Sequence, residues 1–98
     1  MTRKNETKIL RGVVTDVKRT EDFFIDEDGR EWRKCIFSVR LSSFSKRMKN
    51  RKLPKEIDGK VVNVIRYCTF DWHSRVGRSI TLTPEETVTV LKENQLLP

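Results

Sequence analysis

The chain of 98 residues has no long apolar segment. A helix that crosses a membrane needs about 18 to 20 consecutive apolar residues, and no stretch of this sequence approaches that length. The first residues, MTRKNETK, have no apolar core of the kind found in a secretion signal, so the expected location is cytoplasmic, with nucleoid association as one form of it. Two cysteines, Cys35 and Cys68, are too few for a disulfide scaffold and are expected to be reduced.

Residues suited to metal binding and catalysis are also scarce. No CxxC or HxxxH pair occurs, which disfavours a zinc site made by Cys35, Cys68, His73 and Asp71. The DEDG segment has Phe24 where a calcium loop would have its first aspartate. GxSxG, P-loop and HExxH motifs are missing, and a nuclease that uses His73 as its base has little support. We therefore expect no enzyme activity, no cofactor and no metal.

Positive charge is abundant, in contrast. The chain has 21 Lys and Arg against 14 Asp and Glu, a net charge of +7 and a pI near 9.8. Residues 21–31 hold six acids and one arginine, whereas residues 43–60 hold seven basic residues and two acids. This distribution indicates a molecule with a basic side and an acidic side, for which nucleic acid is the first partner to consider.

Short segments rich in β-branched and aromatic residues predict strands. The first covers residues 8–19, with Gly12 marking a bulge or bend. The second is FFI, residues 23–25, followed by a hairpin turn at Asp28-Gly29, where both central residues would take positive φ. The third covers residues 31–41. Its alternation places Cys35, Phe37, Val39 and Leu41 on one face and Trp32, Lys34, Ile36, Ser38 and Arg40 on the other.

The second half begins with a basic connection at residues 43–60, expected to be a short helix or an irregular loop that stops before Pro54. Strands are predicted at residues 60–70 and 78–82, joined by the hairpin loop DWHSRVG. The motif TPEE predicts a helix, with threonine as N-cap, proline at N1 and glutamate at N3 of a capping box. The alternation of TVTVLK is also compatible with a strand, but the start signal favours the helix.

This order of elements resembles the OB-fold family of single-stranded nucleic-acid-binding proteins. The resemblance covers nearly the whole chain and rests on element order and strand patterning. It implies an all-β fold, a five-stranded OB-like barrel with a short helix or basic loop between strands 3 and 4 and a C-terminal helix. An SH3-like barrel is the competing all-β fold, but the long connection between the third and fourth strands fits it less well. We expect a disordered tail at 1–7, the barrel at 8–83, and a helix at 84–98 that packs on the barrel or on a partner.

The resemblance also implies a binding groove on the second and third strands, flanked by the loop between the last two strands. That loop region, RYCTFDWHSRVGRS, combines rings that stack on bases with cations that contact phosphates. Trp32 is alternatively a cap at the barrel end, and one of Tyr67 and Phe70 is expected in the core. The candidate nucleic-acid-binding residues are Trp32, Lys34, Arg40, Lys46, Arg47, Arg66, Tyr67, Phe70, Trp72, His73, Arg75 and Arg78.

These residues predict a sequence-tolerant protein that binds single-stranded nucleic acid, DNA before RNA. Two alternatives stay open. One is a small RNA-binding protein, because rings and cations contact any single strand. The other is an interaction subunit of a larger replication or translation assembly, in which the C-terminal helix, with Leu96 and Leu97, packs on a second copy or on another protein.

Overall fold

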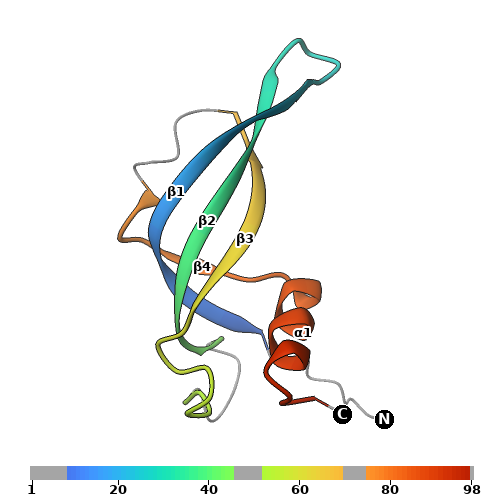
Figure 1. The fold of residues 1–98 in the computed structure, drawn as a ribbon. Coiled ribbons are helices and arrows are strands. Elements are labelled where there is room, and N and C mark those ends of the chain that lie inside the picture. The colour runs from blue at the N-terminus through green and yellow to red at the C-terminus, as the bar shows by residue number, and fades with distance from the viewer. Residues whose placement is uncertain (1–8, 46–51, 70–74, 98) are drawn as a thin grey trace.

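The computed structural model of the protein describes residues 9–45, 52–69 and 75–97 (Figure 1). Its elements are β1 (Leu10–Ile25), β2 (Glu31–Phe44), β3 (Val61–Cys68), β4 (Ser79–Thr81) and α1 (Pro84–Glu93). The strands form one antiparallel sheet in the order β3-β2-β1-β4. The sheet curls into a half-barrel, with α1 beside one end and the β1–β2 hairpin extending from the other (Figure 1). This arrangement is compatible with an OB-like fold, but within the described residues the strands number four.

The prediction of five strands was wrong because the two segments expected at residues 8–19 and 23–25 contribute to one long strand, β1, which runs from Leu10 to Ile25. The polar residues between them form a bulge: Arg19 pairs with Cys35 and Phe23 with Arg33, so three residues of β1 face the single residue Lys34. The Thr20 hydroxyl donates to the carbonyl of Lys34 at 2.9 Å. This bond takes the place of ladder hydrogen bonds across the bulge, so the strand continues where the sequence indicated a break.

The predicted hairpin between residues 60–70 and 78–82 was also wrong. Strand β3 pairs with β2, and β4 pairs with β1, so the two strands lie at opposite edges of the sheet. The described residues just before β4 form hydrogen bonds with β1 instead. The Gly77 N–H donates to the Val14 carbonyl at 2.7 Å, and the Val14 N–H donates to the Arg78 carbonyl at 2.9 Å. The connection after β3 therefore leads from one sheet edge to the other.

One face of the sheet carries the core, and we call it the core face. The alternation predicted for β2 is confirmed, since Cys35, Phe37, Val39 and Leu41 are all buried. Helix α1 closes the core from one end of the sheet with two buried apolar side chains, and the described part of the connection between β2 and β3 adds two more. The residues of the cluster are Leu10, Val14, Val17, Cys35, Phe37, Val39, Leu41, Phe44, Leu53, Ile57, Val64, Cys68, Leu82, Val90 and Leu91.

The predicted start of the helix is confirmed in detail. The Thr83 hydroxyl accepts a hydrogen bond from the Glu86 N–H at 3.1 Å, and the Glu86 carboxylate accepts one from the Thr83 N–H at 2.8 Å. The helix ends at Glu93, and Gln95 follows with φ of 61°. No helix in the described ranges is long and apolar enough to span a membrane.

Gly12 also meets the expectation of an irregularity, because the β1–β2 register shifts between Arg11 and Gly12. A Cβ atom at this position would lie 2.5 Å from the carbonyl oxygen of Arg40 and 2.5 Å from a methyl group of Val39. The close approach of the two strands, rather than a positive φ, therefore requires glycine here.

Of the basic connection, residues 52–60 are described and form turns rather than a helix. Leu53 and Ile57 are buried in the core and hold this segment against the sheet end. The remainder, including the candidates Lys46 and Arg47, lies outside the described residues.

Candidate nucleic-acid interface

The site begins at the turn between β1 and β2. The turn predicted at Asp28-Gly29 is confirmed, although only Gly29 takes a positive φ, of 83°. The carboxylate of Asp26 accepts hydrogen bonds from the backbone N–H groups of Asp28 and Arg30, both at 2.9 Å. Its second oxygen accepts one from the indole Nε1–H of Trp32 at 2.8 Å. The turn thus fixes the orientation of Trp32.

Strand register brings further side chains to the face opposite the core, which we call the outer face. Residues that are direct cross-strand partners project from the same face of a sheet. Trp32 pairs with Phe24 of β1, and Lys34 pairs with Tyr67 of β3. The rows that follow along the outer face are Lys18–Ile36–Ile65, Asp16–Ser38–Asn63 and Val13–Arg40–Val61.

Three aromatic rings meet on the outer face, and we call Phe24, Trp32 and Tyr67 the ring cluster. The rings of Phe24 and Trp32 are nearly parallel, with 8° between their planes and 6.3 Å between their centroids. The ring of Tyr67 lies 5.4 Å from that of Phe24 at an angle of 53°. Phe24 is 47% exposed and Tyr67 46% exposed, so these rings present area to solvent that the core does not use. Tyr67 is consequently not the core residue of the predicted Tyr67–Phe70 pair.

Cations accompany the ring cluster along the outer face. Lys34 lies in the row next to the rings, half-buried, with its Nζ 3.7 Å from the carboxylate of Asp22. Lys18 and Arg40 are exposed further along the same face. An ion pair of this length near the surface contributes little stability. Another anion, such as a phosphate, can therefore replace Asp22 as the partner of Lys34 at little cost in free energy.

The remaining described candidates lie elsewhere. Arg66 projects from the core side of β3, where its guanidinium pairs with the carboxylate of Glu86 and donates to the Thr81 carbonyl at 3.4 Å. This pairing attaches α1 to the sheet, which gives Arg66 a structural role. Arg75 and Arg78 precede β4, at the sheet edge opposite Tyr67. Phe70, Trp72 and His73 lie outside the described residues.

Phe24 is the ring that sequence reasoning missed. It lies in the predicted FFI strand, but neither of the two phenylalanines was assigned to the binding site from the sequence. A usable signal was present: the Asp28-Gly29 turn determines the hairpin register, and that register places Phe24 opposite Trp32. Its neighbour Phe23 lies on the other side of the hairpin, where the guanidinium of Arg33 sits 4.9 Å from the ring centroid.

The two cysteines belong to the core rather than to the interface. Cys35 and Cys68 are both buried and unbridged. Burial, reinforced by the neighbouring Cys35, raises the pKa of the Cys68 thiol to about 12. The Cys68 side chain therefore behaves as a small apolar group at neutral pH.

Comparison of the chain with protein-family models, with curated proteins and with solved structures finds no match.

Proposed function

We propose that the protein binds single-stranded nucleic acid on the outer face of its sheet, without strong sequence preference. The observation that carries this proposal is the ring cluster of Phe24, Trp32 and Tyr67 on three adjacent strands beside Lys34, in which Phe24 and Tyr67 are exposed. Base faces stack on such rings with about 1–3 kcal/mol per base, and stacking accepts any base. Packing within the chain does not account for two rings that remain nearly half exposed.

The distribution of charge along the sheet favours one path for the bound nucleic acid. The β1–β2 turn carries the acids Asp26, Glu27 and Asp28, which repel phosphates at that end. Lys18 and Arg40 lie on the outer face on the other side of the rings, and Asp16 is the one acid in the row between them. We infer that bases stack on the ring cluster while the sugar-phosphate backbone runs away from the turn, over Lys34, Lys18 and Arg40.

The hairpin offers a matched pair of variants for the test. Phe24→Ala removes a ring of the cluster, whereas Phe23→Ala removes a ring of similar exposure, 52% against 47%, from the opposite side. We expect Phe24→Ala to weaken binding of a fluorescein-labelled dT oligomer by about 1–3 kcal/mol, roughly 5- to 150-fold in Kd. Phe23→Ala should bind as the parent does. Fluorescence anisotropy at fixed salt measures both.

Equal affinity of both variants and the parent would contradict the proposal, and so would an equal loss in both. Circular dichroism of each variant establishes that the fold is retained. Parallel titrations with a U oligomer and with duplex DNA separate the remaining nucleic-acid classes. Stacking on exposed rings predicts binding to both single strands and weaker binding to the duplex, whose bases are already stacked.

A further inference from the structure

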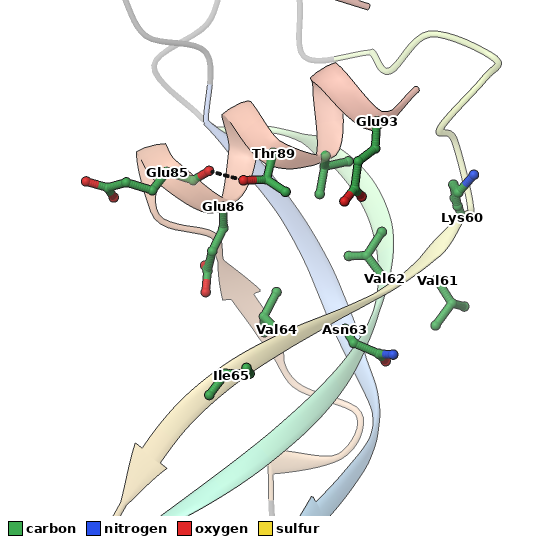
Figure 2. A pocket seen from close by; sticks show the side chains of 11 residues that line it. Lys60, Val61, Val62, Asn63, Val64, Ile65, Glu85, Glu86, Thr89 and Glu93 are labelled. Carbon is green, nitrogen blue, oxygen red and sulfur yellow. Dashed lines mark hydrogen bonds between the residues drawn. The ribbon is translucent and has the colours of Figure 1, made fainter. Parts of the chain in front are cut away.

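A groove beside the helix is separate from the outer-face ring cluster. Its volume is about 560 Å³, and it lies between β3 and α1 (Figure 2). Lys60 and residues 61–65 of β3 line one side, and the helix contributes Glu85, Glu86, Thr89, Val90 and Glu93. Because side chains from both faces of β3 line it, the groove follows the edge of the sheet.

The β2–β3 ladder determines which backbone groups point into this space. The N–H of Leu41 donates to the carbonyl of Lys60 at 2.8 Å, and the Leu41 carbonyl accepts from the N–H of Gly59 at 3.0 Å. In an antiparallel sheet, the N–H and carbonyl groups of every second residue of a strand point to the same neighbouring strand. The backbone groups of Val39, two residues from Leu41, therefore also point to β3. Val39 pairs with Val62, whose own N–H and carbonyl therefore face β2.

The backbone groups of Val61, Asn63 and Ile65 consequently face away from β2, toward the groove. In the described part of the chain no backbone hydrogen bond pairs them, and the Ile65 carbonyl has only a long contact of 3.4 Å from the Arg66 guanidinium. A row of unpaired N–H and carbonyl groups on an edge strand is a template for another strand.

The opposite wall of the groove is acidic. Glu85, Glu86 and Glu93 line it, against the single cation Lys60, in a chain whose net charge is +7. Glu86 is already paired with Arg66, but within the described residues Glu85 and Glu93 take part in no salt bridge. Figure 2 shows the Glu93 carboxylate directed from the helix toward β3.

We propose that this groove binds an extended, basic segment of a partner protein, which adds to the sheet as a strand beside β3. The outward backbone groups of Val61 to Ile65 would pair with a segment of about five residues, roughly 17 Å long. Lys or Arg side chains of that segment would meet Glu93, whose carboxylate is directed toward β3, and Glu85 at the start of the helix would add to the negative charge of the wall. Backbone pairing supplies the affinity, and the acidic wall selects a basic sequence.

Two other occupants fit the groove less well. A second copy that paired its β3 with this one would bring its own acidic helix to the same seam, where the glutamates of both helices would repel. Nucleic acid would place its phosphates against Glu85 and Glu93. The peptide site is thus distinct from the proposed nucleic-acid interface and does not depend on it.

The test uses a pair of variants at Asn63, whose N–H points away from β2. Asn63→Pro removes this outward donor and places a ring in the path of an added strand, while the β2–β3 ladder is kept because proline is tolerated where the N–H faces outward. Asn63→Ala keeps the donor. Both variants remove the same side-chain hydrogen bond, in which the Ser38 hydroxyl donates to Asn63 Oδ1 at 3.2 Å.

The probe is a fluorescein-labelled peptide of four Lys-Val repeats, with four Glu-Val repeats as its charge-reversed counterpart. We expect the full-length protein and Asn63→Ala to bind the lysine peptide alike, and Asn63→Pro to bind it about tenfold more weakly or worse. The double variant Glu85→Gln/Glu93→Gln should also lose affinity. Equal binding by the proline and alanine variants, or equal binding of both peptides to the parent, would overturn the proposal.

Two further measurements keep the test decisive if the proline variant fails to fold. A lysine peptide that is N-methylated at every residue keeps its charges but has no backbone donors, so the parent should not bind it. Retained binding would show that charge alone is responsible and would overturn strand addition. Light scattering of the protein without peptide should give the monomer mass, whereas a dimer abolished by Asn63→Pro would make a second copy the occupant and overturn the proposed partner.

Discussion

Asp26 connects the β1–β2 turn to the ring cluster through a single carboxylate. Its pKa is lowered from the ordinary value of 3.8, first because the Trp32 indole N–H donates to it and then because backbone N–H groups of the turn do so. The charged form is therefore preferred in the folded protein. The stability that this site contributes is present above the ordinary pKa and is lost as the pH falls through the lowered one.

We expect the indole N–H of Trp32 to report this titration. Its NMR signal, assigned by its loss in Trp32→Phe, should move with a midpoint below 3.8 as the pH is lowered. Asp26→Asn replaces the carboxylate by an amide that does not ionise in this pH range, so the signal should not titrate in that variant. A midpoint at or above the ordinary value would mean that the hydrogen bond does not form in solution.

At the scale of elements, one buried hydroxyl joins the helix to the sheet. Thr87 of α1 is fully buried, and its Oγ1 accepts a hydrogen bond from the N–H of Leu10 at 3.1 Å. Leu10 begins β1, and no sheet neighbour takes this N–H because the ladder to β4 starts at Arg11. The helix thus supplies the acceptor that the first residue of the strand needs.

Thr87→Val should lower the free energy of unfolding by about 1–3 kcal/mol, because it keeps the side-chain shape but leaves the Leu10 N–H buried without an acceptor. Thr87→Ser keeps the hydroxyl and removes one methyl group, which should cost roughly 0.8 kcal/mol. Urea denaturation followed by circular dichroism compares the two. If the valine variant is as stable as the serine variant, the hydrogen bond is not an important link between helix and sheet.

At the scale of the whole molecule, the two surfaces of the described structure differ in their balance of charge. The outer face carries Lys18, Lys34 and Arg40 against Asp16, whereas the groove carries Glu85 and Glu93 on α1 against Lys60. The two proposed partners, nucleic acid and a basic peptide, would therefore contact different charged residues of this one small domain.

This separation predicts how salt acts on oligonucleotide binding. When a cation that meets a phosphate of a single strand is removed, the slope of log affinity against log salt becomes shallower by about 0.7. Lys18→Gln and Arg40→Gln should each produce this change. Lys92→Gln, which removes the same charge from the exposed side of α1, should leave the slope unchanged. Identical slopes for all three variants would mean that total charge, rather than the outer face, governs binding.

Patterns confined to neighbouring residues were sufficient for much of the fold. The alternation through Cys35, Phe37 and Val39 identified the buried face of β2, because strand side chains alternate whatever the partner strand is. The motif TPEE predicted the start of α1, because a capping box is satisfied by residues three positions apart. The ring Trp32 and its neighbour Lys34 were correctly placed on the opposite face for the same reason.

The tertiary structure alone decided the features that depend on pairing between distant segments. The polar residues 20–22 indicated a break, but the bond from Thr20 to the Lys34 carbonyl lets β1 continue through them. The pairing of Arg66 with Glu86, twenty residues further on, also depends on the folded sheet, because it joins a strand to the helix beside it. Phe24 joins Trp32 and Tyr67 only because three strands align in register. Sequence patterns determine which side chains share a face of one strand, whereas the contacts between strands are set by the folded sheet as a whole.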